Sequence, residues 1–178
     1  QTANRNNNFL ALILIDLDDF KMINDTFGHA AGDIFLKELS KRIKSVVRQS
    51  DLVGRLGGDE FGVIINGYKL QSDIHILTDK ILGAFEEPIK YGEETFHGKG
   101  SLGVAILAPQ ETPRDAKALM RAADVALYRA KNTGKNNVIY YDQRLGETIQ
   151  QSASMEVALS KATENKELEL YFQPKINS

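Results

Sequence analysis

The chain has 178 residues, of which 42% are hydrophobic and 26% are charged, so we expect a soluble globular domain with its own core. Its net charge of −2 gives no general attraction to nucleic acid or to membranes, and the absence of cysteine excludes disulfides, thiolate zinc sites and cysteine catalysis. We expect a cytoplasmic domain, because no signal peptide is visible and the longest apolar run, Phe9–Ile15, is too short to cross a bilayer.

The run Phe9–Ile15 is continuously apolar, which is typical of a buried central strand. Further amphipathic and apolar segments follow, separated by turn residues. We predict helices over Ala31–Val47 and Leu70–Phe85, a hairpin over Leu52–Ile65, strands near Glu94–His97 and over Gly100–Leu107, a helix from Thr112-Pro113 to Asn132, and a short strand over Val138–Tyr141.

The predicted order of elements is β-α-β-β-α-β-β-α-β. It favours an α+β fold of the ferredoxin-like style, in which helices pack on a mainly antiparallel central sheet. The pattern then changes to a polar helix over Gly146–Glu164 and an unpartnered strand over Leu168–Phe172. We therefore predict a domain over residues 1–143, a linker helix over 144–166, and over 167–178 the first strand of a domain that is cut off.

The hairpin tip Gly57–Phe61 combines bare backbone with two adjacent carboxylates. The glycines allow another molecule to approach the main chain closely. Asp59 and Glu60 repel each other, and a divalent metal with a phosphate ligand would offset this repulsion. Asp16 ends the first strand, and it would face the same metal pair if the hairpin lies on the neighbouring strand. The simpler interpretation of this strand end is a solubilising acidic cluster, or an N-cap for a turn at Phe20–Asp25.

Asn24 and Asp33 could recognise a purine edge, because an amide offers both a donor and an acceptor and a carboxylate accepts from the N–H pair of guanine. Turn chemistry and the helix dipole explain the same two residues equally well. For His29 alone, a structural role at a helix start is favoured. Lys131 and Lys135 flank a helix end, where cations are stabilising in any case, but they could instead bind nucleotide phosphates.

In their order and spacing these motifs resemble the GGDEF family, the diguanylate cyclases. The resemblance covers Phe9–Tyr141, and the tail Leu168–Lys175 resembles the opening of an EAL-type phosphodiesterase domain. The motifs that carry it are Asp16–Lys21, Asn24-Asp25, Gly28-His29, Gly32-Asp33, Gly57–Phe61, Ser101–Gly103, Ala123-Asp124, Ala130-Lys131 and Gly134–Asn136.

The resemblance implies a palm-like fold related to nucleotidyl cyclases and polymerases. It also implies a reaction in which two GTP condense into cyclic di-GMP and release pyrophosphate. Each protomer would hold one GTP, so catalysis would need a homodimer, with Mg²⁺ or Mn²⁺ as the cofactor. In the complete protein we expect an EAL domain in the same chain, a sensory domain upstream that could anchor the protein to a membrane, and no nucleic-acid partner.

The resemblance also assigns roles to individual residues. Metal binding would fall to Asp16, the Leu17 carbonyl and Asp59, with Glu60 assisting. The catalytic residues would be Asp59 as the proton acceptor, Glu60, and Lys21 as a cation for developing phosphate charge. The substrate-binding residues would be Phe20, Asn24, His29, Asp33, Gly57, Gly58, Lys131 and Lys135.

Arg48 and Asp51 form an Arg-x-x-Asp motif that is weak by itself. It lies five residues before the glycine pair, which is the position of the family's inhibitory site. Arg48 could then bind a guanine edge and a phosphate of the product bidentately. A competing hypothesis is a GTP-binding regulatory module for the EAL phosphodiesterase domain, and a third is a cyclic di-GMP receptor that acts only through this motif.

Overall fold

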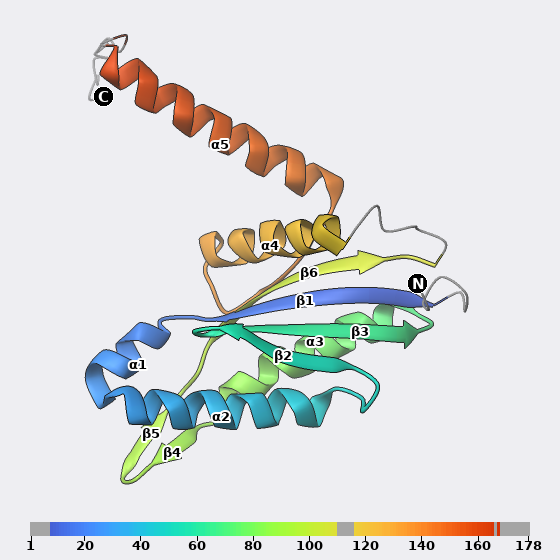
Figure 1. The fold of residues 1–178 in the computed structure, drawn as a ribbon, viewed down its shortest axis with the longest axis vertical. Coiled ribbons are helices and arrows are strands. Elements are labelled where there is room, and N and C mark those ends of the chain that lie inside the picture. Colours follow the sequence, from blue (N-terminus) through green and yellow to red (C-terminus); the bar gives the residue numbers. More distant parts are fainter. Residues whose placement is uncertain (1–7, 110–115, 166, 168–178) are drawn as a thin grey trace, which may run out of the picture. The chain divides into compact units, whose positions relative to one another are not determined.

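The computed structural model describes residues 8–109, 116–165 and 167. The chain divides into two compact units, Gln1–Asp142 and Gln143–Ser178. The elements, labelled in Figure 1, are β1 (Phe9–Leu17), α1 (Phe20–Phe27), α2 (His29–Val46), β2 (Leu52–Gly57), β3 (Glu60–Tyr68), α3 (Gln71–Glu86), β4 (Ile89–Tyr91), β5 (Glu94–Phe96), β6 (Gly100–Leu107), α4 (Ala116–Asn132), β7 (Val138–Tyr140) and, in the second unit, α5 (Gln143–Glu164).

A five-stranded sheet in the order β2-β3-β1-β6-β7 forms the centre of the first unit. Strand β1 pairs antiparallel with β3 on one side and with β6 on the other, β2 pairs antiparallel with β3, and only β6 and β7 are parallel. Strands β4 and β5 form a separate two-stranded sheet. The predicted α+β fold with a mainly antiparallel central sheet is therefore confirmed.

Strand β1 is continuously apolar because both of its faces are buried. Ala11, Ile13 and Ile15 belong to the larger core cluster, which also contains residues of α1, α2 and α3. Leu12 and Leu14 point to the opposite face and belong to a smaller cluster with Ala105, Ala123 and Leu127. Figure 1 shows α4 on one side of the sheet and α2 and α3 on the other. Because successive side chains of a strand point to opposite faces, β1 packs against the helices on both sides of the sheet.

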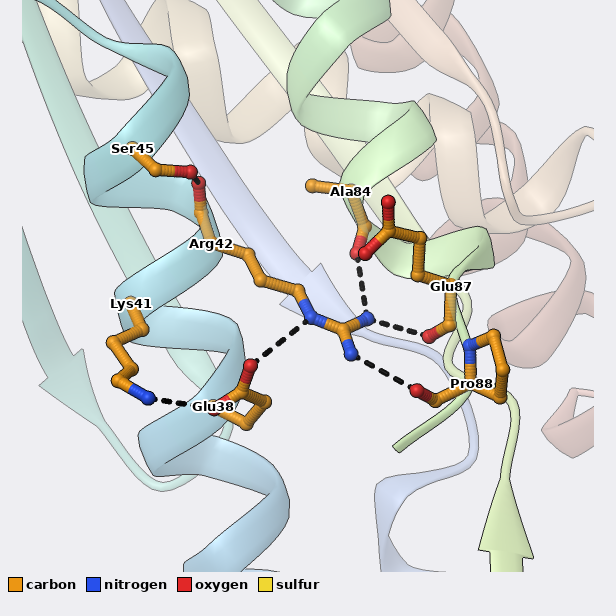
Figure 2. Close-up of polar contacts among 7 residues, drawn as sticks. All are labelled: Glu38, Lys41, Arg42, Ser45, Ala84, Glu87 and Pro88. Carbon is orange, nitrogen blue, oxygen red and sulfur yellow. Dashed lines mark hydrogen bonds and ion pairs between the residues drawn. The ribbon is translucent and has the colours of Figure 1, made fainter. Parts of the chain in front are cut away.

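Arg42 links α2 to the end of α3 by hydrogen bonds, as Figure 2 shows. Its guanidinium donates from Nη1 to the carbonyls of Ala84, at 3.2 Å, and Glu87, and from Nη2 to that of Pro88 at 3.0 Å. The Ala84 carbonyl lies in the last turn of α3, where carbonyls have no partner within the helix, and the carbonyls of Glu87 and Pro88 follow the helix directly. The Arg42 Nε also contacts Glu38 at 3.5 Å. These contacts join α2, which carries the candidate residues His29 and Asp33 near its start, to the end of α3.

Two elements differ from the sequence prediction. The segment predicted as a turn at Phe20–Asp25 is the helix α1, whose Phe20 and Ile23 are buried. Its eight residues include Asn, Asp and Thr, which compete with the helix locally, so tertiary burial decides its conformation. Strand β4, three residues long, was not predicted and pairs with β5. The predicted helix start at Thr112-Pro113 and the strand over Leu168–Phe172 lie outside the described residues.

Across the described residues, none of the helices combines the length and the hydropathy that crossing a bilayer would need.

Candidate active site

The end of β1 and the tip of the β2–β3 hairpin lie side by side in the central sheet. Asp16 is opposite Glu60 in the β1–β3 register, and the N–H of Leu17 donates to the carbonyl of Asp59 at 3.4 Å. The sequence left open whether the hairpin lies on the strand next to β1, and the structure shows that it does. As a result, Asp16 at the end of β1, Asp59 in the hairpin turn and Glu60 at the start of β3 lie at the same end of the sheet.

The hairpin tip presents its backbone to solvent. Gly58 has φ 52°, a left-handed conformation that glycine adopts without steric cost. A Cβ atom at Gly57 or at Gly58 would meet no other atom within 4 Å, so the space in front of the tip is open. Arg55 donates from Nε to the Gly58 carbonyl at 2.7 Å and thereby supports the turn from behind. This open backbone can accommodate a ligand that lies directly against the main chain.

Asp16 is the buried acid of this group, with 6% of its surface exposed. Burial raises the pKa of its carboxyl group, because the charged form loses hydration. The hydrogen bond and the charge of Lys131 lower that pKa in part, while the negative charges of Asp59 and Glu60 raise it. The Lys131 Nζ lies 2.6 Å from Asp16 Oδ2. A carboxylate in such surroundings favours a nearby cation.

The second predicted phosphate-binding cation reaches the same strand end. The Nζ of Lys135 lies 2.7 Å from Oδ1 of Asp19, and both side chains are largely exposed. The hydrogen bond from Lys135 to Asp19, followed by the charge of Asp19, raises the pKa of the lysine. Lys131 and Lys135 come from the end of α4 and the turn after it, more than a hundred residues along the chain from the acids. The fold therefore brings both lysines and the acidic strand end into one site.

The donor chemistry of the site suits a hard divalent cation. Asp16, Asp59, Glu60 and the Leu17 carbonyl offer only oxygen atoms, which are the ligands that Mg²⁺ prefers. Within the described ranges, no group of three or more His, Cys, Asp or Glu side chains is arranged to hold a metal ion. Mg²⁺ usually binds through one or two carboxylates together with water and substrate phosphates, so the residues fit an ion that arrives with a nucleotide.

The helices α1 and α2 bring the predicted guanine-binding residues together. A Cβ atom at Gly32 would lie 2.0 Å from Asn24 Oδ1 and 3.1 Å from Phe20 Cζ. Glycine at this position therefore makes room for the Asn24 side chain against the first turns of α2. Asp33 follows directly and is exposed. The predicted pair of a purine-reading amide and carboxylate consequently lies at one corner of the molecule, where α1 meets α2.

Three other predicted residues lie on the same two helices in different surroundings. Phe20 is buried and its ring packs at 6.2 Å from that of Phe35, so it belongs to the core that supports α1. Lys21 is exposed in the first turn of α1, and His29 is exposed in the first turn of α2. Both of these side chains are accessible to a ligand.

Arg48 and Asp51 form a tight turn at the opposite end of β2 from the glycine pair. The N–H of Arg48 donates to Asp51 Oδ2 at 2.9 Å, and the Tyr68 hydroxyl donates to the same oxygen at 3.3 Å. The Arg48 guanidinium carbon lies 3.9 Å above the centre of the Tyr68 ring, a cation–π contact. The other Asp51 oxygen is buried and has no hydrogen-bond partner within the described residues.

A cavity of about 310 Å³ opens beside this turn, between the end of α2 and one face of α3. Its lining combines a guanidinium, an ammonium and a carboxylate with apolar side chains, which suits a ligand that is both aromatic and anionic. The lining residues are Val46, Arg48, Tyr68, Asp73, Ile76, Leu77 and Lys80. Sequence reasoning missed the contribution of Tyr68, because no motif links it to an arginine twenty residues earlier.

The comparisons with known proteins agree with this geometry. Residues 1–137 match the protein family described as "Diguanylate cyclase, GGDEF domain". The chain is 38% identical over 168 residues to "Cyclic di-GMP phosphodiesterase NbdA" from Pseudomonas aeruginosa, covering 93% of this chain and 21% of that protein. It is 32% identical over 176 residues to the "Bifunctional diguanylate cyclase/cyclic di-GMP phosphodiesterase MucR" of the same organism, covering 99% and 25%.

A solved structure of TpbB (YfiN) from Pseudomonas aeruginosa that comprises only the GGDEF domain superposes on this chain with a TM-score of 0.78. The two are 35% identical in sequence, and the match covers 84% of this chain and 86% of that one. The chain spans a quarter or less of the length of NbdA and MucR. The predicted palm-type fold is confirmed by this likeness.

Proposed function

Because this chain belongs to the GGDEF family of diguanylate cyclase domains, we propose that it condenses two GTP into cyclic di-GMP at the interface of a homodimer. In each half-reaction, the 3′-oxygen of one GTP attacks the α-phosphorus of the GTP on the facing protomer. The bond between the α-phosphorus and the bridging oxygen breaks, and pyrophosphate leaves. The observation that carries the proposal is the meeting of Asp16, the Asp59–Glu60 tip and the two lysines at one end of the sheet.

Each part of the site has a role in this reaction. Mg²⁺ or Mn²⁺, held by Asp16, the Leu17 carbonyl and Asp59 with help from Glu60, would neutralise the triphosphate and make the attacking hydroxyl more acidic. Asp59 accepts the proton of the 3′-hydroxyl. The open backbone of Gly57 and Gly58 lets the nucleotide lie against the hairpin tip.

The substrate is selected and held at both of its ends. Asn24 and Asp33 read the guanine edge by hydrogen bonding. Lys21 stabilises the charge that develops on phosphate, and Lys131 and Lys135 bind the terminal phosphates. In the free chain these two lysines pair with Asp16 and Asp19. When Asp16 holds a metal ion, Lys131 would no longer be needed to balance its charge, and the Lys131 ammonium group would be free to bind phosphate.

We expect purified chain with GTP and Mg²⁺ to form cyclic di-GMP at a rate per protomer that rises with protein concentration. The reason is that one protomer supplies only half of the reacting pair, so the active species is a dimer. Chromatographic assay of the product across a concentration series measures this. Asp59→Ala should remove the activity, whereas Glu94→Ala, an exposed acid on β5, should leave it unchanged. Absence of product at every concentration, with Asp59→Ala behaving like the wild type, would contradict the proposal.

The cavity beside Arg48 supports inhibition by the product. Arg48, whose guanidinium is held over the Tyr68 ring, can bind phosphate and the guanine edge, and Lys80 adds a second cation. A ligand donor could also reach the unpaired oxygen of Asp51 after a small rearrangement of the turn. Product bound here would lie at the end of β2 remote from the catalytic tip, so inhibition would act through the sheet or through the dimer.

Arg48→Ala is expected to weaken inhibition by cyclic di-GMP at least about tenfold, because a charge-assisted hydrogen bond contributes about 1.5–3 kcal/mol. The measurement is the cyclic di-GMP concentration that halves the initial rate of product formation. Arg121→Ala, which removes an exposed arginine from α4, is the matched control, and cyclic di-GMP should inhibit it as strongly as it inhibits the wild type. Equal inhibition of both variants would exclude Arg48 from the inhibitory site.

The phosphodiesterase name of NbdA favours one second candidate. In that case the chain binds GTP without converting it and regulates an EAL domain in a longer protein. GTP binding that Asn24→Ala abolishes, together with no cyclic di-GMP at any protein concentration, would favour this function over catalysis. In a longer protein that carries an EAL domain, GTP would then stimulate hydrolysis of cyclic di-GMP.

A further inference from the structure

In the sequence, Asp18 lies between the candidate metal ligands Asp16 and Leu17 and the residue Asp19. Its carboxylate accepts hydrogen bonds from other parts of the protein. Ser101 donates from Oγ to Asp18 Oδ1 at 2.8 Å, and the backbone N–H of Asn136 donates to Asp18 Oδ2 at 2.8 Å. The N–H of Asp18 itself donates to the Lys99 carbonyl at 2.9 Å. One side chain therefore connects the end of β1 to the start of β6 and to the turn that follows α4.

The turn held by Asp18 has an unusual backbone. Gly134, Lys135 and Asn136 have φ values of 112°, 59° and 46°, all in the left-handed region. For residues with a Cβ atom this conformation is disfavoured, more for lysine than for asparagine, and it persists where the surroundings hold it. The Lys135 N–H is satisfied by the Ala130 carbonyl at 3.2 Å, within the end of α4. The Asn136 N–H is satisfied by Asp18, across the site.

We propose that Asp18 is a positioning residue that holds the Gly134–Asn136 turn in its left-handed conformation and thereby places the Lys135 ammonium group for the terminal phosphates of the nucleotide. The identity of that nucleotide rests on the function proposed above. Without the Asp18 acceptor, the strained turn relaxes and Lys135 moves away from Asp19. Lys131, one turn earlier at the end of α4, is displaced less because it belongs to the helix.

The substitution Asp18→Asn distinguishes a positioning role of this residue from a metal-binding role. Its amide oxygen can accept from the Asn136 N–H, and its amide nitrogen can donate to the Ser101 hydroxyl, which also accepts hydrogen bonds. Asp18→Asn therefore keeps both connections and loses only the charge, whereas Asp18→Ala loses both connections. If Asp18 acted as a metal ligand, the two variants would fail alike.

The test combines two measurements on the wild type, Asp18→Ala and Asp18→Asn. The first is the binding of the α,β-methylene analogue of GTP, which cannot release pyrophosphate, compared with the binding of GMP. We expect Asp18→Ala to bind the analogue about tenfold more weakly, as for the loss of one charge-assisted contact to phosphate, with GMP binding unchanged. Asp18→Asn should remain within about threefold of the wild type for both nucleotides.

The second measurement is hydrogen exchange at the Asn136 amide in the free chain, which needs no nucleotide and no turnover. Exchange should become faster in Asp18→Ala and stay slow in Asp18→Asn. If Asp18→Ala does not fold, Ser101→Ala takes its place, because it removes one of the two anchors of the carboxylate and should accelerate exchange to a smaller degree.

Unchanged exchange in Asp18→Ala, or equal loss of analogue binding in both Asp18 variants, would overturn this inference. A wild-type chain that binds the analogue but forms no cyclic di-GMP would instead count against the proposed catalysis and leave the positioning role intact.

Discussion

Asp16→Asn is expected to lower the rate of cyclic di-GMP formation by at least about a hundredfold while raising the thermal stability of the free chain at pH 7. The loss of activity follows from the proposed role of Asp16, because removing a carboxylate that holds the metal would forfeit several kcal/mol of transition-state stabilisation, and each 1.36 kcal/mol is about tenfold in rate. Asparagine has nearly the same shape and can still accept a hydrogen bond from Lys131. We therefore expect the fold and the position of Lys131 to be kept in this variant.

The gain in stability follows from the sign of the pKa shift. Burial and the neighbouring acids raise the pKa of Asp16 in the folded chain above its ordinary value of 3.8. A group with a raised folded pKa contributes stability while it is protonated, and this contribution is lost as the pH rises through the folded pKa. At pH 7, which lies above the ordinary pKa of the group, the raised pKa of Asp16 in the folded chain therefore costs stability, and the neutral amide removes that cost.

Melting temperatures and initial rates at pH 7, together with melting temperatures at lower pH, measure both effects. The stability advantage of Asp16→Asn should shrink as the pH falls toward the ordinary pKa of the group. Asp79→Asn, an exposed acid on α3, is the matched control and should change neither quantity. A variant that is less stable than the wild type at pH 7 would contradict the electrostatic argument, and a variant that retains its activity would contradict the role of Asp16.

The second large effect is expected at Gly103, where α4 crosses β6. A Cβ atom there would lie 2.2 Å from the Leu127 nitrogen and 2.3 Å from the Ala123 carbonyl oxygen, both of which are backbone atoms of α4. Neither atom can move without displacing the helix. Gly103→Ala should therefore lower the free energy of unfolding by about 3 kcal/mol, the upper part of the range for overpacking a core. It should also lower activity, because α4 carries Lys131.

Gly83→Ala is the matched control for this substitution. Gly83 lies within α3, and a Cβ atom there would meet nothing within 4 Å. Because alanine is the better helix former, this variant should gain about 0.5–1 kcal/mol. Urea unfolding of the two variants and the wild type gives both free energies. A loss below about 1 kcal/mol at Gly103 would mean that α4 can shift outward, contrary to the close contact of backbone and strand.

Most of the first unit could be predicted because its segments have strong local patterns. The run that became β1 is apolar at every position since both faces of the strand are buried, and β6 was predicted with the bounds that the structure has. The elements that escaped prediction are short. Strand β4 has three residues and α1 has eight, and in both cases burial against other elements, rather than local preference, decides the conformation.

The candidate site was predictable in its composition and less so in its connections. The acids of β1 and of the hairpin tip were candidates by residue type, but the sequence left it as a possibility that the hairpin lies on the strand next to β1. Two helices separate these segments along the chain, and only the sheet order brings them together. The pairing of Lys131 with Asp16 and of Lys135 with Asp19 joins residues more than a hundred positions apart. No periodicity or motif spacing encodes such a contact, since it depends on how α4 packs across β6.

The sequence alone therefore determined which chemical groups the candidate site contains: carboxylates that could bind a divalent cation, bare glycine backbone, and separate cations that could bind phosphate. These follow from residue types and their order, which are independent of packing. Only the tertiary structure decided which lysine meets which acid, that the Asp18 carboxylate accepts a hydrogen bond from the turn after α4, and that Tyr68 lies beneath Arg48. These contacts depend on the register of the sheet and on how the helices pack against it, and the whole core sets both.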